Sequence, residues 1–294
     1  MSEQVQIDRA MSEFETAIAQ LRPELHRYLA RMAGSVIDGE DLVQETLLKA
    51  SRAISGGIGV TNLRSWLFSI AHNTAMNFFR SQKSEQAMKH QAALQMPPLD
   101  QLPRHNSTAG NLRPLMALPP KQRSTVILRD VLGYSASDVA GLTGMSVDAV
   151  KSALHRGRAG LQAQHAGAAP ASQSELSDTA REQLKRYAER FNAHDFDAVR
   201  DMLAEEVHLE LVSVEERRGE AVGLYFTNYS KRDDWLMAPG VIEGRPGILA
   251  FDRNDAAGPP SYFILLEFRD GELLDIRDFR YARYVMDGAE WTRI

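Results

Sequence analysis

The sequence predicts a multidomain fold in which two all-α modules precede a C-terminal α+β domain, with helices packed on a curved antiparallel sheet. Three observations lead to this prediction. Apolar residues recur at helical spacing from residue 12 to residue 161, and they alternate as in strands after residue 206. Stretches rich in small and polar residues interrupt the chain at 85–114 and 166–177. A chain of 294 residues is long enough for two or three domains.

The composition narrows the class of protein. The chain has no cysteine, so disulfides and thiolate metal sites are excluded, and a reducing compartment is compatible. No apolar run approaches the roughly 20 residues that span a bilayer, and the acidic start lacks an apolar signal core. We therefore expect a cytoplasmic protein with no membrane association, no cofactor and no metal.

The charge is unevenly distributed along the chain. Residues 100–165 carry 8 basic and 4 acidic side chains, a net charge of +4, while residues 166–294 carry 16 and 25, a net charge of −9. Exposed charges act over only about 10 Å at physiological salt, so the local sign matters more than the total of −5. The basic segment is the candidate for nucleic-acid binding. The acidic tail either competes with DNA or simply keeps the protein soluble.

Residues 118–161 predict three short helices. Proline and serine favour helix starts, and glycine favours the turns that follow helices. The residues that set these limits are Pro119, Pro120, Gly133, Ser135 or Ser137, Gly144 and Ser146. Two helices joined by a glycine turn, the second with a capped start, are typical of a helix-turn-helix.

The third of these helices has two distinct faces. Val150, Leu154 and Leu161 form its apolar face at 100° per residue. The opposite face and its flanks are polar and mostly basic: Asp148, Lys151, Ser152, His155, Arg156 and Arg158. Spacing alone leaves open an ordinary three-helix packing unit with solvated charges.

Three longer helices are expected before this segment. The first covers 12–32, with Pro23 as a kink or break, and the second covers 40–54, capped by Asp38. Leu48 lies on the polar side of the second helix, which indicates either a protein contact or a stray surface leucine. The third, 63–84, has an outer arc of aromatic and basic residues, which suits unpaired bases or a buried bundle helix.

The amino-acid sequence of residues 118–161 resembles region four of bacterial sigma factors of the extracytoplasmic-function (ECF) group. The matching strings are LPPKQR, LRDVLGYSASDVAGLTGMS and VDAVKSALHRGRAGL. The resemblance implies a helix that reads the upstream (minus-35) promoter element. Its implied contacts are Ser146, Asp148, Lys151, Ser152, His155, Arg156 and Arg158. A related helix-turn-helix occurs in response regulators.

Two earlier strings resemble sigma region two, which response regulators lack. DGEDLVQETLLKA implies a helix that docks on core RNA polymerase through Asp38, Asp41, Gln44, Glu45 and Leu48. LRSWLFSIAHNTAMNFFRSQK implies contacts with the downstream (minus-10) element through Asn62, Arg64, Ser69, His72, Asn73 and Arg80. Fewer basic residues follow this helix than is usual in the family, so DNA binding is expected to be weaker.

The C-terminal part changes character. Ser177 or Asp178 caps a helix, Asp195 starts a shorter one, and strands are expected at 207–214, 240–251, 262–268 and 273–284, the last two joined by a hairpin at RDGE. The strings RYAERFNAHDFDAVRDMLAEEVHLELV, GVIEGRPGILAFD and LLDIRDFRYARYV resemble the SnoaL-like, ketosteroid-isomerase-like domains fused to some ECF sigma factors. The tryptophan-led linker motif and the glycine-rich motif of many such tails are not found clearly.

A cone of this kind suggests a pocket. Candidate pocket residues are Tyr187, Phe191, His208, Trp235 and Tyr262, and further acid or base candidates are His194, Asp195, Asp233, Asp234 and Asp278. None has a spacing that catalysis demands, and no metal-ligand spacing occurs, so no catalytic residue and no metal are assigned.

The resulting prediction is a sigma factor that guides core RNA polymerase to promoter DNA and is not an enzyme. Its expected organisation is region two at 1–84, a linker at 85–114, region four at 115–165, a second linker at 166–177 and a regulatory SnoaL-like domain at 178–294. A small-molecule effector of the C-terminal domain is a further candidate partner. The alternatives are a tail that is an active isomerase or cyclase, a tail that senses a ligand, and a DNA binder of the response-regulator type.

Overall fold

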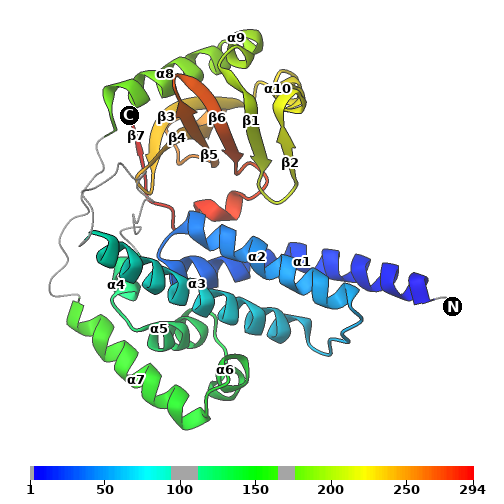
Figure 1. Ribbon diagram of the computed structural model, residues 1–294, viewed down its shortest axis with the longest axis vertical. Helices are drawn as coiled ribbons and strands as arrows, with labels where there is room; N and C mark the ends of the chain where they lie inside the picture. Colours follow the sequence, from blue (N-terminus) through cyan, green and yellow to red (C-terminus); the bar gives the residue numbers. More distant parts are fainter. Residues whose placement is uncertain (1–2, 94–111, 165–175) are drawn as a thin grey trace. The chain divides into compact units, whose positions relative to one another are not determined.

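The computed structural model describes residues 3–93, 112–164 and 176–294, with side chains described for 16–85, 88, 112–163 and 176–294. The chain divides into two compact units, residues 1–170 and 171–294 (Figure 1). The first unit is helical and the second combines helices with one sheet, which confirms the predicted sequence of fold classes. Most of both predicted linkers lies outside the described residues.

The first unit begins with three long helices, α1 (Glu3–Ala33), α2 (Val36–Ser55) and α3 (Leu63–Ala93). Helix α1 continues through Pro23, where a kink or break was expected. Helix α2 starts earlier than predicted, because the Ser35 side chain is its N-cap and accepts a hydrogen bond from the Asp38 backbone N–H at 3.1 Å. Asp38 is therefore a first-turn residue and not the cap.

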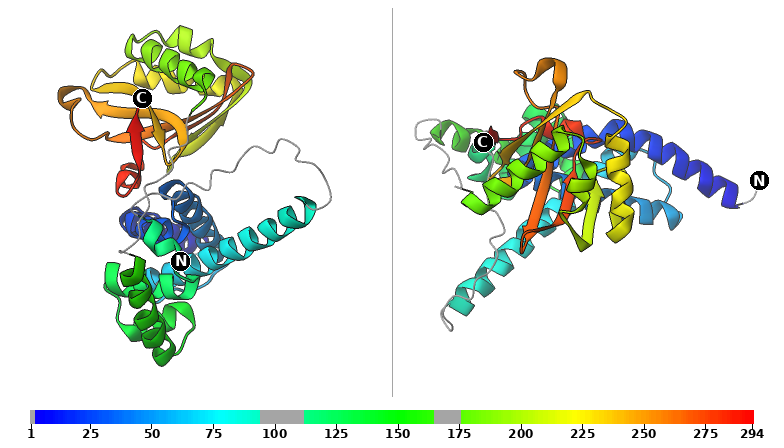
Figure 2. Two further views of the ribbon diagram at one scale, coloured as in Figure 1. Left: turned by 90° about the vertical axis from the view of Figure 1, so that its left-hand side faces the viewer. Right: turned by 90° about the horizontal axis from the view of Figure 1, so that it is seen from above.

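Helix α3 continues beyond its predicted end at Ser84 to Ala93, so the start of the predicted linker is helical. Residues 84–93 contain neither proline nor glycine and are rich in alanine and glutamine, which favour helices. Figure 2 shows α3 as a long rod whose last turns extend past its neighbouring helices.

The second half of this unit contains the helix-turn-helix. Its elements are α4 (Arg113–Met116), α5 (Pro120–Val126), the π-helix η1 (Ile127–Val131), α6 (Ala136–Thr143) and α7 (Val147–Gln164). Ser135 caps α6 in a reciprocal capping box with Asp138, and Gly133 and Gly144 have φ values of 75° and 68°. Caps and glycine turns therefore lie where the sequence predicts them.

A single hydrophobic core joins both halves of the first unit. It includes Tyr28 and Phe68 from α1 and α3 together with Ile127 and Val139 from η1 and α6. Gly39 lets α1 and α2 approach closely, because a Cβ there would lie 2.5 Å from the Ala30 Cα. The two segments predicted as separate modules therefore pack as one body.

The second unit starts with α8 (Asp178–Asn192) and α9 (Phe196–Arg200), capped by Ser177 and Asp195 respectively. Its later helical elements are η2 (Gly219–Val222), α10 (Gly223–Tyr229), η3 (Arg253–Asp255) and η4 (Arg283–Met286). The strands are β1 (Leu203–Leu211), β2 (Glu215–Arg218), β3 (Trp235–Ile242), β4 (Arg245–Asp252), β5 (Tyr262–Arg269), β6 (Glu272–Asp278) and β7 (Trp291–Arg293).

The strands form one sheet in the order β2-β1-β6-β5-β4-β3-β7. The β1–β6 pair is parallel and the remaining pairs are antiparallel, so the prediction of a purely antiparallel sheet was wrong. Alternation of apolar residues reports which side of a strand is buried but carries no information about the direction of its neighbour.

Two strand boundaries also differ from the prediction. The segment 240–251 is not one strand but parts of β3 and β4, joined by a tight turn in which Glu243 and Gly244 have φ values of 48° and 77°. Strand β6 ends at Asp278, and the chain then forms η4.

Helices α8, α9 and α10 enclose the main core of the second unit on one face of the sheet (Figure 1). Leu184 and Phe191 of α8 meet Leu209 of β1 and Ile264 of β5 there. Throughout the described ranges of both units, no helix has the length and apolar character needed to cross a membrane.

Candidate nucleic-acid interface

Helix α7 presents its predicted DNA-reading side chains to solvent. The Ser146 side chain caps the helix by accepting from the Ala149 N–H at 3.2 Å. Val150 and Ala153 face the core, which fixes the rotation of the helix. The predicted contact residues are all exposed: Ser146, Asp148, Lys151, Ser152, His155, Arg156 and Arg158.

The basic residues of α7 differ in their surroundings. Arg158 makes a two-pronged ion pair with Asp130 of η1, with Nε–Oδ2 and Nη2–Oδ1 distances of 2.9 and 2.6 Å, and this carboxylate raises the pKa of Arg158. Lys151 Nζ lies 3.6 Å from Asp148 Oδ1. In the described part of the chain, no ion pair engages Arg156. Arg156 is therefore the arginine of this face that is available to a phosphate or a base.

Helix α2 places the predicted polymerase contacts along its outer side. Leu48 is 52% exposed, and Asp41 and Glu45 are also exposed. Glu45 receives a hydrogen bond from Lys49 Nζ at 2.6 Å. Asp38 and Gln44 are half-buried on the same helix.

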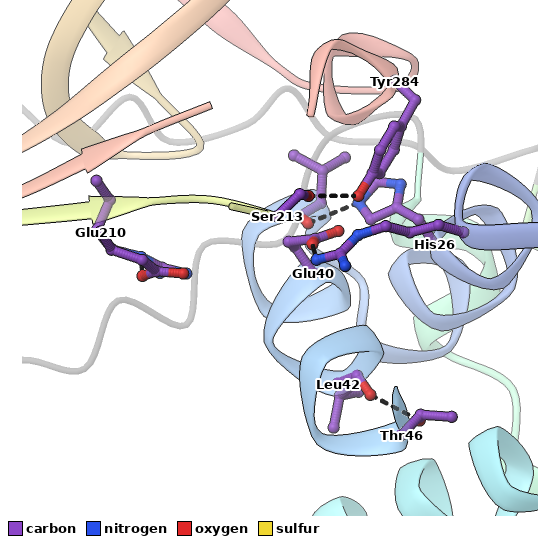
Figure 3. A network of polar contacts seen from close by, with 10 residues as sticks. His26, Glu40, Leu42, Thr46, Glu210, Ser213 and Tyr284 are labelled. Carbon is purple, nitrogen blue, oxygen red and sulfur yellow. Dashed lines mark hydrogen bonds and ion pairs between the residues drawn. The ribbon is translucent and has the colours of Figure 1, made fainter. Parts of the chain in front are cut away.

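The inner side of α2 is held by buried polar contacts. Glu40 is buried and accepts a hydrogen bond from Arg22 Nη2 at 2.5 Å, and Thr46 Oγ1 donates to the Leu42 carbonyl at 2.7 Å (Figure 3). These contacts fix which side of α2 faces outward.

Helix α3 exposes only some of its predicted DNA contacts. Asn62 caps the helix start by accepting from the Ser65 N–H at 3.0 Å, and Asn73 is exposed. Arg80 is exposed and donates to Asn77 Oδ1 at 2.7 Å. Ser69 is half-buried and donates to the Ser65 carbonyl at 3.1 Å.

Arg64 and His72 instead face the helix-turn-helix. Arg64 pairs with Glu24 of α1, and its guanidinium carbon lies 4.4 Å from the Tyr134 ring centroid. His72 is only 7% exposed, and its Nδ1 lies 3.0 Å from the Tyr28 hydroxyl and 3.1 Å from the Ser124 hydroxyl. The two hydroxyls are 3.0 Å apart, so three polar atoms from α1, α3 and α5 form a closed triangle.

The prediction of a DNA contact for His72 is therefore corrected to a core role in this arrangement. Burial lowers the pKa of His72 to about 4, and the positive charge of Lys121 adds to that effect. The imidazole is neutral at pH 7, so Nδ1 is available as an acceptor for a hydroxyl.

Arg123 is a second buried link between the two halves, and sequence reasoning did not single it out. This side chain is 3% exposed and donates to the carbonyls of Met32, Met116 and Leu118 at 2.5, 3.0 and 3.0 Å. Burial lowers its pKa to about 10. Its position in the LPPKQR string gave no signal of a partner far away in sequence.

The second unit contains a buried acid surrounded by tyrosines. Asp278 Oδ2 accepts from the Tyr225 and Tyr229 hydroxyls at 2.9 and 2.8 Å, and Oδ1 accepts from the Arg280 N–H at 2.8 Å. Because Tyr229 donates to Asp278, the Tyr262 hydroxyl donates to Tyr229, at 3.1 Å. Burial raises the pKa of Asp278, and these hydrogen bonds oppose that rise.

The candidate pocket residues separate into two places. Tyr187, Phe191, Trp235 and Tyr262 belong to the main core, where Phe191 lies 5.4 Å from Tyr187 and 4.9 Å from Trp235 between ring centroids. His208 does not join them, because it points to the other side of β1 and its Nδ1 lies 2.6 Å from Asp275 Oδ1. The alternation Val207, His208, Leu209 was the signal for this orientation.

Other acid or base candidates make contacts that stabilise the fold. His194 stacks on Trp235 with 5.1 Å between ring centroids, and Asp195 caps α9 by accepting from the Ala198 N–H at 3.1 Å. Asp234 pairs with Arg232. Asp278 and the pocket candidate Tyr262 are also brought together, because both contact the Tyr229 hydroxyl.

Comparisons with known proteins match both helical segments to families. Residues 17–85 match the family described as Sigma-70 region 2, and residues 113–161 match Sigma-70, region 4. The RNA polymerase sigma factor CarQ of Myxococcus xanthus is 32% identical over 157 residues, which are 51% of this chain and 87% of CarQ. The chain belongs to the ECF sigma factors.

Two further similarities concern longer parts of this sigma factor. The ECF RNA polymerase sigma factor SigG of Mycobacterium tuberculosis is 32% identical over 231 residues, and the match spans 69% of this chain and 62% of SigG. The chain therefore spans less than two thirds of the length of that relative. The crystal structure of the M. tuberculosis ECF sigma factor SigJ is similar over 91% of this chain and 95% of SigJ, with 20% identity and a TM-score of 0.34.

In this ECF sigma factor the two sets of implied promoter contacts are unequally accessible. Those on α7 are exposed, whereas α3 has Arg64 and His72 engaged with α5, α6 and the turn before α6. The polar contacts of Ser124 with Tyr28 and His72, and of Arg123 with the Met32 carbonyl, therefore link α5 to α1 and α3.

Proposed function

We propose that this chain directs core RNA polymerase to specific promoters and starts transcription there, without catalysis of its own, and that its C-terminal domain modulates this activity in cis. The observation that carries the proposal is α7, a capped helix in the basic segment with Ser152, His155 and Arg156 exposed on its outer face. Such a helix fits the major groove, where these side chains reach base edges and phosphates.

The outer side of α2 is the proposed contact with core polymerase. Leu48 is an exposed apolar side chain on the same side of the helix as two exposed acids that precede it, and apolar anchors with a polar rim are typical of protein interfaces. Glu45 and Asp41 supply that rim.

The packed arrangement of the first unit is proposed to be a resting form. Promoter elements about 25 base pairs apart are about 80 Å apart along B-DNA at 3.4 Å a base pair. A compact unit of 170 residues has a radius of gyration of about 15 Å. The segments around α3 and α7 therefore have to separate before both elements are bound at once.

The C-terminal domain is proposed to bias that opening. A domain on the same chain acts at a high effective concentration, set by the connection between the two units. Its net charge of −9 opposes the approach of DNA to the basic helix-turn-helix segment. An enzymatic tail has less support. The Asp278 carboxylate already accepts hydrogen bonds from side chains and backbone of the protein, and the candidate pocket residues pack as core.

Run-off transcription tests the function. Core polymerase would be combined with the full chain or with residues 1–170, on promoters selected from a random library. Initiation by either form, absent with core polymerase alone, is the expected result, and the ratio of transcripts between the two forms gives the sign of control by the tail. Initiation by neither form would refute the sigma function, and equal initiation by both would refute modulation by the tail.

A further inference from the structure

Arg280 is a half-buried cation that follows strand β6. Its guanidinium carbon lies 4.7 Å from the Tyr229 ring centroid and 5.9 Å from the Tyr281 ring centroid. Its backbone N–H holds Asp278, but among the described residues no carboxylate forms an ion pair with its guanidinium. A half-buried arginine normally has such a partner.

Two further arginines stand next to it, and we call Arg232, Arg280 and Arg283 the arginine cluster. The Arg283 guanidinium carbon is 5.7 Å from the Tyr262 ring centroid, and the Tyr262 hydroxyl touches that of Tyr229. Asp234 raises the pKa of Arg232, and the like charge of Arg280 opposes that rise because it is nearby.

The cluster has more cations than nearby exposed anions. Asp234 pairs with Arg232, while Arg280 and Arg283 stand over tyrosine rings. Gathering like charges raises the electrostatic free energy of the fold. The domain carries 25 acidic side chains, so the unbalanced cations do not follow from a shortage of carboxylates. Burial opposes the charge of Arg280, but Tyr229, Tyr262 and Asp278 nearby raise its pKa overall, so Arg280 keeps its positive charge.

Unpaired donors border the same place. The Tyr187 hydroxyl and the Trp235 Nε1–H are buried and have no hydrogen-bond partner among the residues that the structure describes. Burial raises the pKa of Tyr187, and the nearby Asp278 and Tyr262 contribute to that rise. The Trp235 ring lies 5.8 Å from that of Tyr229 between centroids. Buried donors nearly always find an acceptor, so these two donors call for an acceptor from outside the protein, either a water molecule or an oxygen of a ligand.

We propose that the arginine cluster binds a small organic anion, a compound that carries a carboxylate or phosphate group together with further oxygen acceptors. The guanidinium groups of Arg280 and Arg283 take the anionic group through forked hydrogen bonds. The exposed ring of Tyr281 packs against the body of the compound. Binding at this site does not depend on whether the chain acts as a sigma factor.

The charge of the domain favours a small anion over nucleic acid. A duplex presents a long row of phosphates to the whole face of a domain whose net charge is −9. A small anion meets only the charges within about 10 Å, where the cluster dominates.

Calorimetric titration of the full chain with inorganic phosphate, with citrate and with a short DNA duplex tests the proposal. We expect saturable one-site binding of citrate or phosphate, weakened at least tenfold by Arg280→Gln. Arg181→Gln on α8 makes the same change of charge at an exposed position outside the cluster, so it should leave affinity within about twofold. Circular dichroism of the unliganded variants checks folding, and Arg283→Gln, at an exposed position, replaces Arg280→Gln if that variant does not fold.

Three results of these titrations would overturn the proposal. Absence of saturable binding to either small anion overturns the proposal. Equal loss in Arg181→Gln means a diffuse charge effect and also overturns it. Binding of the duplex alone, lost in Arg280→Gln, would make the cluster a DNA contact and not a site for a small anion.

Discussion

Arg156 and Arg158 lie two residues apart on α7 but face different groups. Arg158 is bound by both oxygens of Asp130, whereas Arg156 is exposed without an ion pair in the described part of the chain. An arginine that is already paired gives up its carboxylate before it binds DNA. We therefore expect the two residues to contribute differently to the proposed promoter recognition.

Arg156→Ala should weaken binding to upstream-element DNA by about 1–3 kcal/mol if Arg156 reads a base. Fluorescence anisotropy with labelled duplexes measures the change. A scrambled duplex is the control: equal loss on both sequences would identify Arg156 as a phosphate contact without base specificity. Arg158→Ala should lower stability only slightly, because its ion pair with Asp130 is exposed to solvent and screened by salt.

Tyr225 and Tyr187 offer a second matched pair. Tyr225→Phe removes a hydrogen bond to the buried Asp278 carboxylate and should lower the free energy of unfolding of the second unit by about 1–3 kcal/mol. Tyr187→Phe removes a buried hydroxyl that has no partner, so in the absence of ligand its effect should be near zero or slightly stabilising. Urea denaturation of both variants measures the difference. Similar losses in the two variants would contradict the hydrogen-bond assignment.

At the scale of elements, three helices meet at one polar triangle. Tyr28 of α1, His72 of α3 and Ser124 of α5 contact one another inside an otherwise apolar core. This contact requires a neutral imidazole, because burial disfavours its charged form. Packing between α3 and α5 is therefore coupled to pH.

The sign of that coupling follows from the pKa of His72. The folded value of about 4 lies below the ordinary value of 6.5, so the stabilisation is complete above pH 6.5 and is lost as pH falls from 6.5 to 4. A difference of between two and three pKa units corresponds to about 3 kcal/mol at the acidic limit. In His72→Gln the amide oxygen can still accept a hydrogen bond, but the side chain does not gain a proton. The free energy of unfolding of this variant should therefore fall less than that of the wild type between pH 6.5 and pH 4. Hydrogen exchange of α5 amides at pH 7, 5.5 and 4.5 measures it, and parallel behaviour of the two proteins would rule out His72 as the titrating group.

At the scale of the whole chain, the proposed binding of both promoter elements at once requires the first unit to change shape. The absence of cysteine permits two dyes to be attached at introduced cysteines, Asn77→Cys on α3 and Gly141→Cys on α6, both at exposed positions. Energy transfer between the dyes should be high in the free protein and should fall when core polymerase and promoter DNA are added. Labelled protein with core polymerase and a scrambled duplex is the control. Unchanged transfer in a complex that makes transcripts would show that α3 and α6 stay together.

The sequence predicted what is determined locally. The caps at Ser135 and Ser177 and the turn at Gly144 depend on side chains within a few residues of each other. These signals placed α6, α7 and α8 correctly and put Ser152 and Arg156 on the exposed side of α7.

What the sequence did not predict depends on contacts distant along the chain. Nothing near His72 indicates that Ser124 will cover it, and nothing in Leu203–Leu211 indicates a parallel neighbour. The hairpin between β3 and β4 was missed because an apolar run on both sides of Glu243 and Gly244 looked like one strand. A glycine flanked by alternating residues was the signal that could have located this turn.

The core that α1, α3, η1 and α6 share has a consequence for exchanging parts between relatives. A chimera that takes its helix-turn-helix from another sigma factor would inherit that factor's promoter preference but not the surface that fits α1 and α3. Tyr28, His72, Ser124 and Arg123 would have to travel as a set across both halves. Exchanging only exposed outer residues of α7, such as Ser152, His155 and Arg156, keeps Val150 and Ala153 in place and leaves this core intact.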